Sequence, residues 1–178
     1  MEVRKLFSRS HGFTLMEIVI VIGITGILAS SGYASYIATQ RNSRDGRRKA
    51  DLETIRQALE MYKSENGSYP GETNCDSSVG SDATSDCATC LGSGTCAVQS
   101  DWDASSTFVS SIQPNYILDL PKDPINNATN YYYYEPVCNQ TITVCGQSYD
   151  CTVSGTCCAY QIGAYLENTP AWHTLCNP

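Results

Sequence analysis

The sequence predicts an α+β fold in which one long N-terminal helix packs on a small antiparallel β-sheet with disulfide-rich loops. Three observations predict it. Residues 13–38 are long and apolar enough to span a membrane, helical spacing of apolar residues continues to about residue 65, and all ten cysteines follow that point. Once the helix is set aside, the 178 residues leave room for one globular domain.

The apolar run from Ile18 to Ala38 is interrupted only by small or weakly polar residues. Roughly 20 such residues span a bilayer core as a helix. One full charge, Glu17, lies near its start. A carboxylate at the bilayer centre costs about 2.5 to 3.5 kcal/mol on insertion scales, so we expect Glu17 to have a positively charged partner.

A short leader, residues 1–12, precedes the apolar run and carries Arg4, Lys5, Arg9 and His11. A secretory signal would place its cleavage site after the apolar segment. Here the junction that suggests processing, Gly12-Phe13, comes before it. Cleavage there would keep the helix on the mature protein and create an amino terminus one helical turn from Glu17.

This arrangement of Gly12, Phe13, Thr14, Leu15 and Glu17 before an apolar span resembles the class III signal of type IV pilins and type II secretion pseudopilins. The resemblance implies that a prepilin peptidase cuts after Gly12 and methylates the amine of Phe13. It also implies that Glu17 neutralises the amino terminus of a neighbouring subunit in a helical filament. A buried carboxylate that faces an ammonium group is compensated, whereas a lone one is penalised. The alternative is a single-pass anchor whose acid lies near the interface.

Charge is distributed unevenly along this acidic chain of net charge −7. Arg41 to Lys49 contains five bases and one acid, whereas the chain from Ser64 onward contains twelve acids and one base, Lys122. This pattern indicates lipid head-group contact or pairing between subunits, and argues against nucleic acid binding by the domain. The positive-inside rule weakly favours the reverse orientation. The leader motif and the cysteines instead favour an extracytoplasmic domain.

An even number of cysteines beyond the membrane span predicts a disulfide framework in an oxidising compartment. The sequence alone does not give the pairing. If Cys157 and Cys158 lie on a strand, their side chains point to opposite faces and should bond different partners. The ten cysteines are Cys75, Cys87, Cys90, Cys96, Cys138, Cys145, Cys151, Cys157, Cys158 and Cys176.

Cys87 and Cys90 have the spacing of a redox motif, and Cys96 could join them in a zinc site. A thioredoxin-type site needs a helix start that tunes the thiolate, but these flanks are loop residues. Zinc would require reduced thiols and has no histidine nearby. Structural disulfides are therefore the favoured interpretation.

The helix is expected to continue beyond the membrane as an amphipathic segment that packs on the domain. Ala50, Leu52, Ile55, Leu59 and Tyr62 follow a helical spacing, and Asn66-Gly67 supplies a stop. Many pilins carry a proline in the outer half of the span, where this chain has Ala34. The expected organisation is a leader (1–12), a transmembrane and polymerisation helix (13–38), an amphipathic continuation (39–65) and an extracytoplasmic domain (66–178).

Two short elements of the distal domain resemble those of major pseudopilins, Asn66-Gly67-Ser68-Tyr69-Pro70 and Leu120-Pro121-Lys122-Asp123-Pro124. Strands are expected over 131–135, 140–144 and 158–166, with turns at Gly146 and Gly155. Alternation on the first strand would bury two of the four tyrosines 131–134. Residues 107–116 form a short helix or are irregular, and 71–100 should be a cysteine-pinned loop without a core.

No calcium site, other metal or cofactor is predicted. Major pseudopilins bind calcium in an acidic loop after the final strands, but residues 163–170 contain one acid, Glu167, and calcium prefers several anionic ligands. A disulfide to Cys176 could hold the tail instead. No catalytic set of side chains is recognisable, so an enzyme is not expected.

The sequence thus predicts a structural subunit of a type IV pilus-like filament. One alternative is a major pseudopilin of a type II secretion system, and another is a membrane-anchored, disulfide-rich binding protein. The implied partners are copies of itself and related pilins, a prepilin peptidase, an inner-membrane assembly platform and membrane lipid. The chain would be a single-pass membrane protein before it joins a pilus or pseudopilus.

Overall fold

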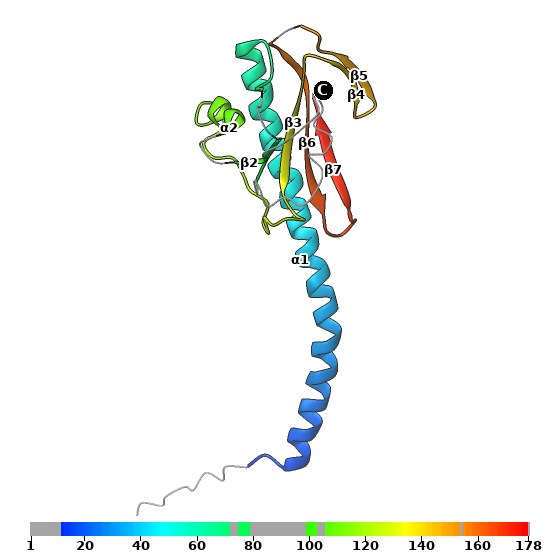
Figure 1. Ribbon diagram of the computed structural model, residues 1–178. Helices are drawn as coiled ribbons and strands as arrows, with labels where there is room; N and C mark the ends of the chain where they lie inside the picture. The colour runs from blue at the N-terminus through cyan, green and yellow to red at the C-terminus, as the bar shows by residue number, and fades with distance from the viewer. Residues whose placement is uncertain (1–11, 72–74, 79–98, 103–105, 154, 178) are drawn as a thin grey trace, which may run out of the picture. The chain divides into compact units, whose positions relative to one another are not determined.

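The computed structural model describes residues 12–71, 75–78, 99–102, 106–153 and 155–177 (Figure 1). The chain forms two compact units, residues 1–40 and residues 41–178. One helix, α1 (Leu15–Asn66), contributes to both. The leader residues 1–11 lie outside the described part of the chain.

Both ends of α1 have local causes. The Glu17 N–H donates to the Thr14 hydroxyl oxygen at 3.2 Å, so Thr14 caps the helix. The helix therefore begins at Leu15, two residues after the expected start at Phe13. At the other end Gly67 has φ +76°, and its N–H donates to the Lys63 carbonyl at 2.8 Å. The predicted stop at Asn66-Gly67 is confirmed.

In the first unit, the described side chains of α1 are exposed nearly all round. Phe13, Leu15 and Met16 are 80%, 82% and 68% exposed, and the large apolar side chains up to Tyr36 are also exposed. Within the described residues, α1 is the one helix long and apolar enough to cross a membrane. An uncharged helix surface of this kind needs lipid or other helices around it.

The second unit contains two sheets. The larger has the order β2-β1-β3-β6-β7, and the smaller is the hairpin β4-β5 (Figure 1). All pairs are antiparallel except β1-β2. The strands are β1 (Cys75–Ser77), β2 (Gln99–Asp101), β3 (Tyr132–Cys138), β4 (Thr141–Val144), β5 (Gln147–Asp150), β6 (Cys157–Leu166) and β7 (Ala171–Cys176).

Four strands were not predicted: β1, β2, β5 and β7. β1 and the start of β2 lie in the segment expected to be a loop, and their parallel pairing corrects the purely antiparallel expectation. The three predicted strands all form, although β4 pairs with β5 and lies outside the main sheet. Gly146 and Gly155 lie in turns with φ near +80°, as expected.

The core lies between α1, α2 (Thr107–Ile112) and the main sheet. Leu52, Ile55 and Leu59 of α1 are fully buried, which confirms the amphipathic prediction. Ala50, however, is exposed because it lies on the opposite side of the helix. The sheet supplies buried aromatic rings, and the α2 ring Phe108 stacks on Tyr134 at 4.0 Å between centroids.

The tyrosine run corrects one expectation. Tyr131, Tyr132 and Tyr134 are all buried, rather than two of the four. Tyr132 and Tyr134 face the helix, whereas Trp172 of β7 packs edge-on against Tyr131 and Tyr133, with both centroid distances 5.2 Å. A ring from β7, two strands away in the sheet, therefore covers the side of β3 that alternation left to solvent.

Three disulfides are formed among the described cysteines, namely Cys138–Cys157, Cys145–Cys176 and Cys151–Cys158. Cys138–Cys157 links β3 to β6, and the other two disulfides join the β4-β5 hairpin to β7 and β6 of the main sheet. Cys157 and Cys158 bond different partners, as their position on one strand predicted. Cys176 holds the tail, as expected. Cys87, Cys90 and Cys96 lie outside the described residues, as does the side chain of Cys75.

Candidate functional site

The residues predicted for processing and assembly lie at the start of α1. Gly12 and Phe13 precede the helix and are exposed. Thr14 caps it, and Glu17 is the acid of its first turn. A negative charge in a first turn interacts favourably with the helix dipole. The fold therefore holds Glu17 one turn beyond the proposed new amino terminus.

The Glu17 carboxylate is solvent-exposed and makes no ion pair or hydrogen bond within the part of the chain that the structure describes. Its backbone N–H is occupied by Thr14, but its charge is not neutralised by a described residue. Around it α1 offers apolar surface alone, such as Ile18, Val19 and Ile20, each about half exposed. Any counter-charge must come from outside these residues.

The second unit treats its charges in the opposite way. The guanidinium of Arg48 is fully buried and contacts three carboxylates. Its Nε lies 2.6 Å from Asp123, and its Nη1 lies 2.7 Å from Asp45 and 2.8 Å from Glu167. Three segments meet here: α1, the loop before β3, and the turn between β6 and β7. We call these residues, with Arg44, the arginine cluster.

Arg44 completes the arginine cluster through a two-pronged contact with Glu167, at 2.7 Å and 2.6 Å. Hydrogen bonding from Arg44 and Arg48 lowers the pKa of Glu167 to about 2, against the effect of its partial burial. Burial alone would raise the pKa of Asp45. The N–H groups of Glu167 and Asn168 and the Arg48 guanidinium outweigh it, so the pKa lies below its ordinary value.

The arginine cluster includes Glu167, the acid of the loop over 163–170 that was compared above with a calcium loop. This carboxylate is bound by two arginines instead of facing a metal. Among the described residues, no group of three or more histidine, cysteine or acidic side chains is arranged to hold a metal ion. Guanidinium groups hold this turn against the helix.

Sequence reasoning missed the arginine cluster, although two signals for it were present. Asp45 and Arg48 have the i, i+3 spacing of a helical ion pair. Asp123 was recognised as part of a turn motif, but its role as the buried partner of Arg48 was not. Asp123 also accepts from the Ile125 N–H at 2.8 Å, so it orders its own loop. Asp123 and Glu167 lie 75 and 119 residues from Arg48, separations that a local pattern does not show.

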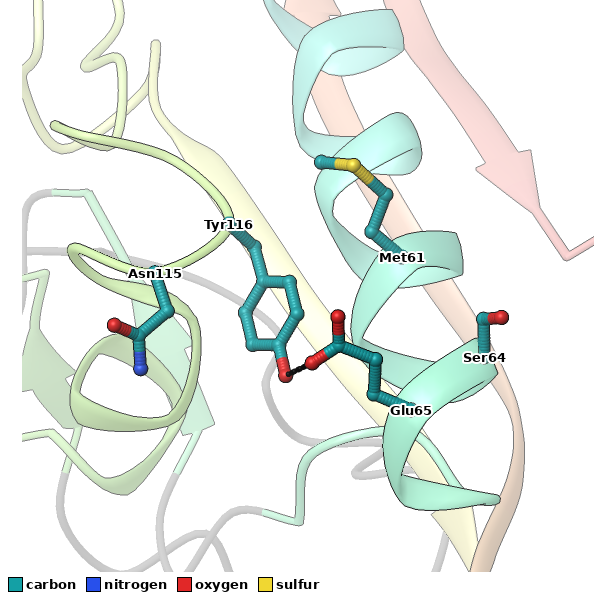
Figure 2. Close-up of a pocket in the computed structure, with 5 residues that line it drawn as sticks. All are labelled: Met61, Ser64, Glu65, Asn115 and Tyr116. Carbon is teal, nitrogen blue, oxygen red and sulfur yellow. Dashed lines mark hydrogen bonds between the residues drawn. The ribbon is translucent and has the colours of Figure 1, made fainter.

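A shallow, open pocket of about 310 Å³ lies near the C-terminal end of α1, between the helix and the loop after α2 (Figure 2). It is lined by Met61, Ser64, Glu65, Asn115 and Tyr116. Figure 2 shows the Tyr116 ring pointing at Glu65, and its hydroxyl donates to that carboxylate at 2.7 Å.

Comparisons with known proteins agree with the N-terminal assignment. A family model described as a prokaryotic N-terminal methylation motif matches residues 7–33, a segment that includes Gly12, Phe13 and Glu17. No solved structure matches the chain.

Several curated relatives are type II secretion system core proteins G. The one from Vibrio cholerae is 27% identical over 146 residues, which cover 79% of this chain and 81% of that protein. The one from Aeromonas hydrophila is 37% identical over 62 residues, 35% of this chain and 43% of that protein. The type IV major pilin protein PilA of Myxococcus xanthus is 34% identical over 74 residues, 42% of this chain and 34% of that protein.

The chain therefore spans less than half the length of the Aeromonas relative and about four-fifths of the Vibrio relative. By its methylation motif, its long N-terminal helix with an antiparallel sheet, and these relatives, the chain resembles the family of type IV pilins and type II secretion pseudopilins.

Proposed function

We propose that this protein is a major pseudopilin of a type II secretion system, a structural subunit that polymerises through its N-terminal helix. The observation that carries the proposal is the exposed apolar half of α1 with the unneutralised Glu17 in its first turn. Lipid would surround this surface before assembly, and the helices of other subunits would surround it afterwards. We also propose a leader over 1–12 and an extracytoplasmic domain.

Processing would supply the missing positive charge. Cleavage after Gly12 would create an amino terminus at Phe13, which stays cationic when it is methylated. In lipid, an ammonium group and a carboxylate are each costly alone and compensate one another when they meet. A neighbouring subunit shifted along the filament would bring its own Phe13 amine to Glu17. The pair would then select a register between subunits as well as stabilise it.

The Vibrio relative supports the secretion branch because its similarity extends over 79% of this chain and thus well beyond the N-terminal helix. The oxidised cysteines of the domain support an extracytoplasmic location. The second candidate is a type IV pilus subunit. The similarity to PilA over 74 aligned residues favours it. Both candidates use the same helix and differ in what the filament does.

Deletion of the gene and complementation with the wild-type chain test the proposal. Two properties are measured in parallel: release of secreted proteins into the medium, and surface filaments seen by electron microscopy. We expect secretion to be lost on deletion and restored on complementation, with surface filaments unaffected. Loss of surface filaments with normal secretion would instead establish the pilus candidate. Retention of both would leave the anchored binding protein.

Mass spectrometry of the mature protein supplies a separate test of processing. The expected mass corresponds to a chain that begins at Phe13 with one added methyl group. The same strain carrying Gly12→Ala should accumulate a chain that begins at Met1. A wild-type product that still begins at Met1 would contradict the proposed processing and, with it, the charge pairing at Glu17.

A further inference from the structure

The structure divides the basic segment Arg41 to Lys49 into two sets. Arg44 and Arg48 are taken up by the arginine cluster. Arg41 and Lys49 are exposed and make no ion pair or hydrogen bond within the described residues. Arg47 is 66% exposed and forms an i, i+4 ion pair with Asp51, at 3.6 Å. We call Arg41, Arg47 and Lys49 the cationic collar.

The cationic collar surrounds the helix instead of marking one face. At 3.6 residues per turn each residue advances about 100°, so Lys49 lies roughly 80° and Arg47 roughly 240° around the axis from Arg41. The gaps between the three directions are thus about 80°, 160° and 120°. The head-group layer of a membrane encircles a helix that passes through it, so basic side chains on several sides of the helix suit that layer.

Sequence position puts the cationic collar where a head-group layer would be. Arg41 and Lys49 follow Ala38, the last residue of the apolar run, by three and eleven positions. Helical side chains slant toward the N-terminus, which brings the longer ones back toward the apolar segment. Attraction of basic side chains to an anionic surface extends over about one Debye length, roughly 8 to 10 Å.

We propose that the cationic collar binds the head groups of anionic phospholipids at the membrane surface from which α1 emerges. The rest of the domain is acidic, with twelve acids and one base from Ser64 onward, and an anionic surface would repel it. The collar is then the point of attraction, and it would hold the domain upright at a fixed depth. The proposal rests on membrane insertion of the helix, as the proposed function does, but not on filament assembly.

Native mass spectrometry of the full chain in detergent tests this inference. Phosphatidylglycerol, which is anionic, and phosphatidylcholine, which is zwitterionic, are added at equal concentration, and lipids bound per chain are counted. We expect phosphatidylglycerol to be preferred at least about fivefold at low salt, with the preference falling as salt rises. Arg41→Gln/Arg47→Gln/Lys49→Gln should abolish the preference. The matched single changes are Arg41→Gln, expected to weaken it, and Lys122→Gln, an exposed base elsewhere, expected to leave it intact.

Equal binding of the two lipids by the wild type would overturn the proposal, as would a preference that survives the triple change. If the triple change instead dissociates dimers and leaves lipid binding unaltered, the collar serves a second copy of the chain and the lipid assignment is wrong. Circular dichroism of each variant checks that the helix and domain are folded. Failure here with normal secretion in cells would reject the lipid site alone, whereas the deletion experiment tests the proposed function.

Discussion

The two units of this protein handle charge in opposite ways. In residues 12–40, the single carboxylate Glu17 lies exposed on an apolar helix with no described partner. In residues 41–178, the fully buried Arg48 is surrounded by three carboxylates within 2.8 Å. Both arrangements place a charge where solvent cannot compensate it, once α1 is in lipid. Within the described residues, the charge of Arg48 is neutralised and that of Glu17 is not.

The difference shows which unit neutralises its charges with its own described residues. A buried charge with well-placed partners can be tolerated, but removal of one partner is expensive. The arginine cluster satisfies this condition within the fold, because Arg44 and Arg48 together bind Glu167 of the β6-β7 turn. Glu17 has no such partner among the described residues, which agrees with the proposed pairing to the amino terminus of a neighbouring subunit.

The largest expected effect comes from removing the charge of Glu17, which has no described partner. Glu17→Gln keeps the size and hydrogen-bonding capacity of the side chain but not its charge. We expect assembly to be abolished, measured as loss of secretion or of polymer in sheared and membrane fractions. Removal of the leader, residues 1–12, should continue, as checked by mass spectrometry. The matched control is Glu53→Gln, an exposed acid of the same helix paired with Arg56, for which assembly should stay normal. Wild-type polymer from Glu17→Gln would refute the contrast.

Removing the buried charge of Arg48 should lower the free energy of unfolding of the second unit. Arg48→Met leaves three carboxylates near one another without their common partner, and breaking such a buried pair costs about 3 to 5 kcal/mol. The free energy of unfolding is measured by denaturant titration of the full chain in detergent. Arg56→Met removes an exposed guanidinium 2.7 Å from Glu53 and should cost less than about 1 kcal/mol. Similar losses for both variants would show that the arginine cluster has no special role.

Sequence reasoning succeeded where a signal is local and failed where it is not. The apolar span, the stop at Gly67 and the separation of Cys157 from Cys158 each follow from a few neighbouring residues, and each is confirmed where the structure tests it. β7 is an exception, because it pairs with the strand just before it, β6, and was still missed. The Asp123–Arg48 contact joins residues 75 positions apart. The side of β3 covered by Trp172 was missed for the same reason.

Acid should lower the free energy of unfolding of the second unit. The pKa of Glu167 is lowered to about 2 in the fold, chiefly by hydrogen bonding from Arg44, and the pKa of Asp45 is also lowered. The unfolded chain therefore binds more protons than the folded chain as the pH falls from about 5 to 2, so stability falls over that range. Thermal unfolding between pH 7 and pH 2 measures this. Glu167→Gln should flatten the decline, and an unchanged profile would contradict the assignment.

The smallest expected effect concerns the cap that fixes Glu17 in place. Thr14→Ala removes the hydroxyl that accepts from the Glu17 N–H at 3.2 Å, and loss of such a cap costs about 1 kcal/mol. Amide hydrogen exchange of the full chain in micelles should therefore quicken about fivefold at Glu17, whereas Thr14→Ser, which keeps the hydroxyl, should match the wild type. Because the charge of Glu17 survives, Thr14→Ala should reduce assembly far less than Glu17→Gln does. Equal assembly defects from the two would mean that the position of the carboxylate matters as much as its charge.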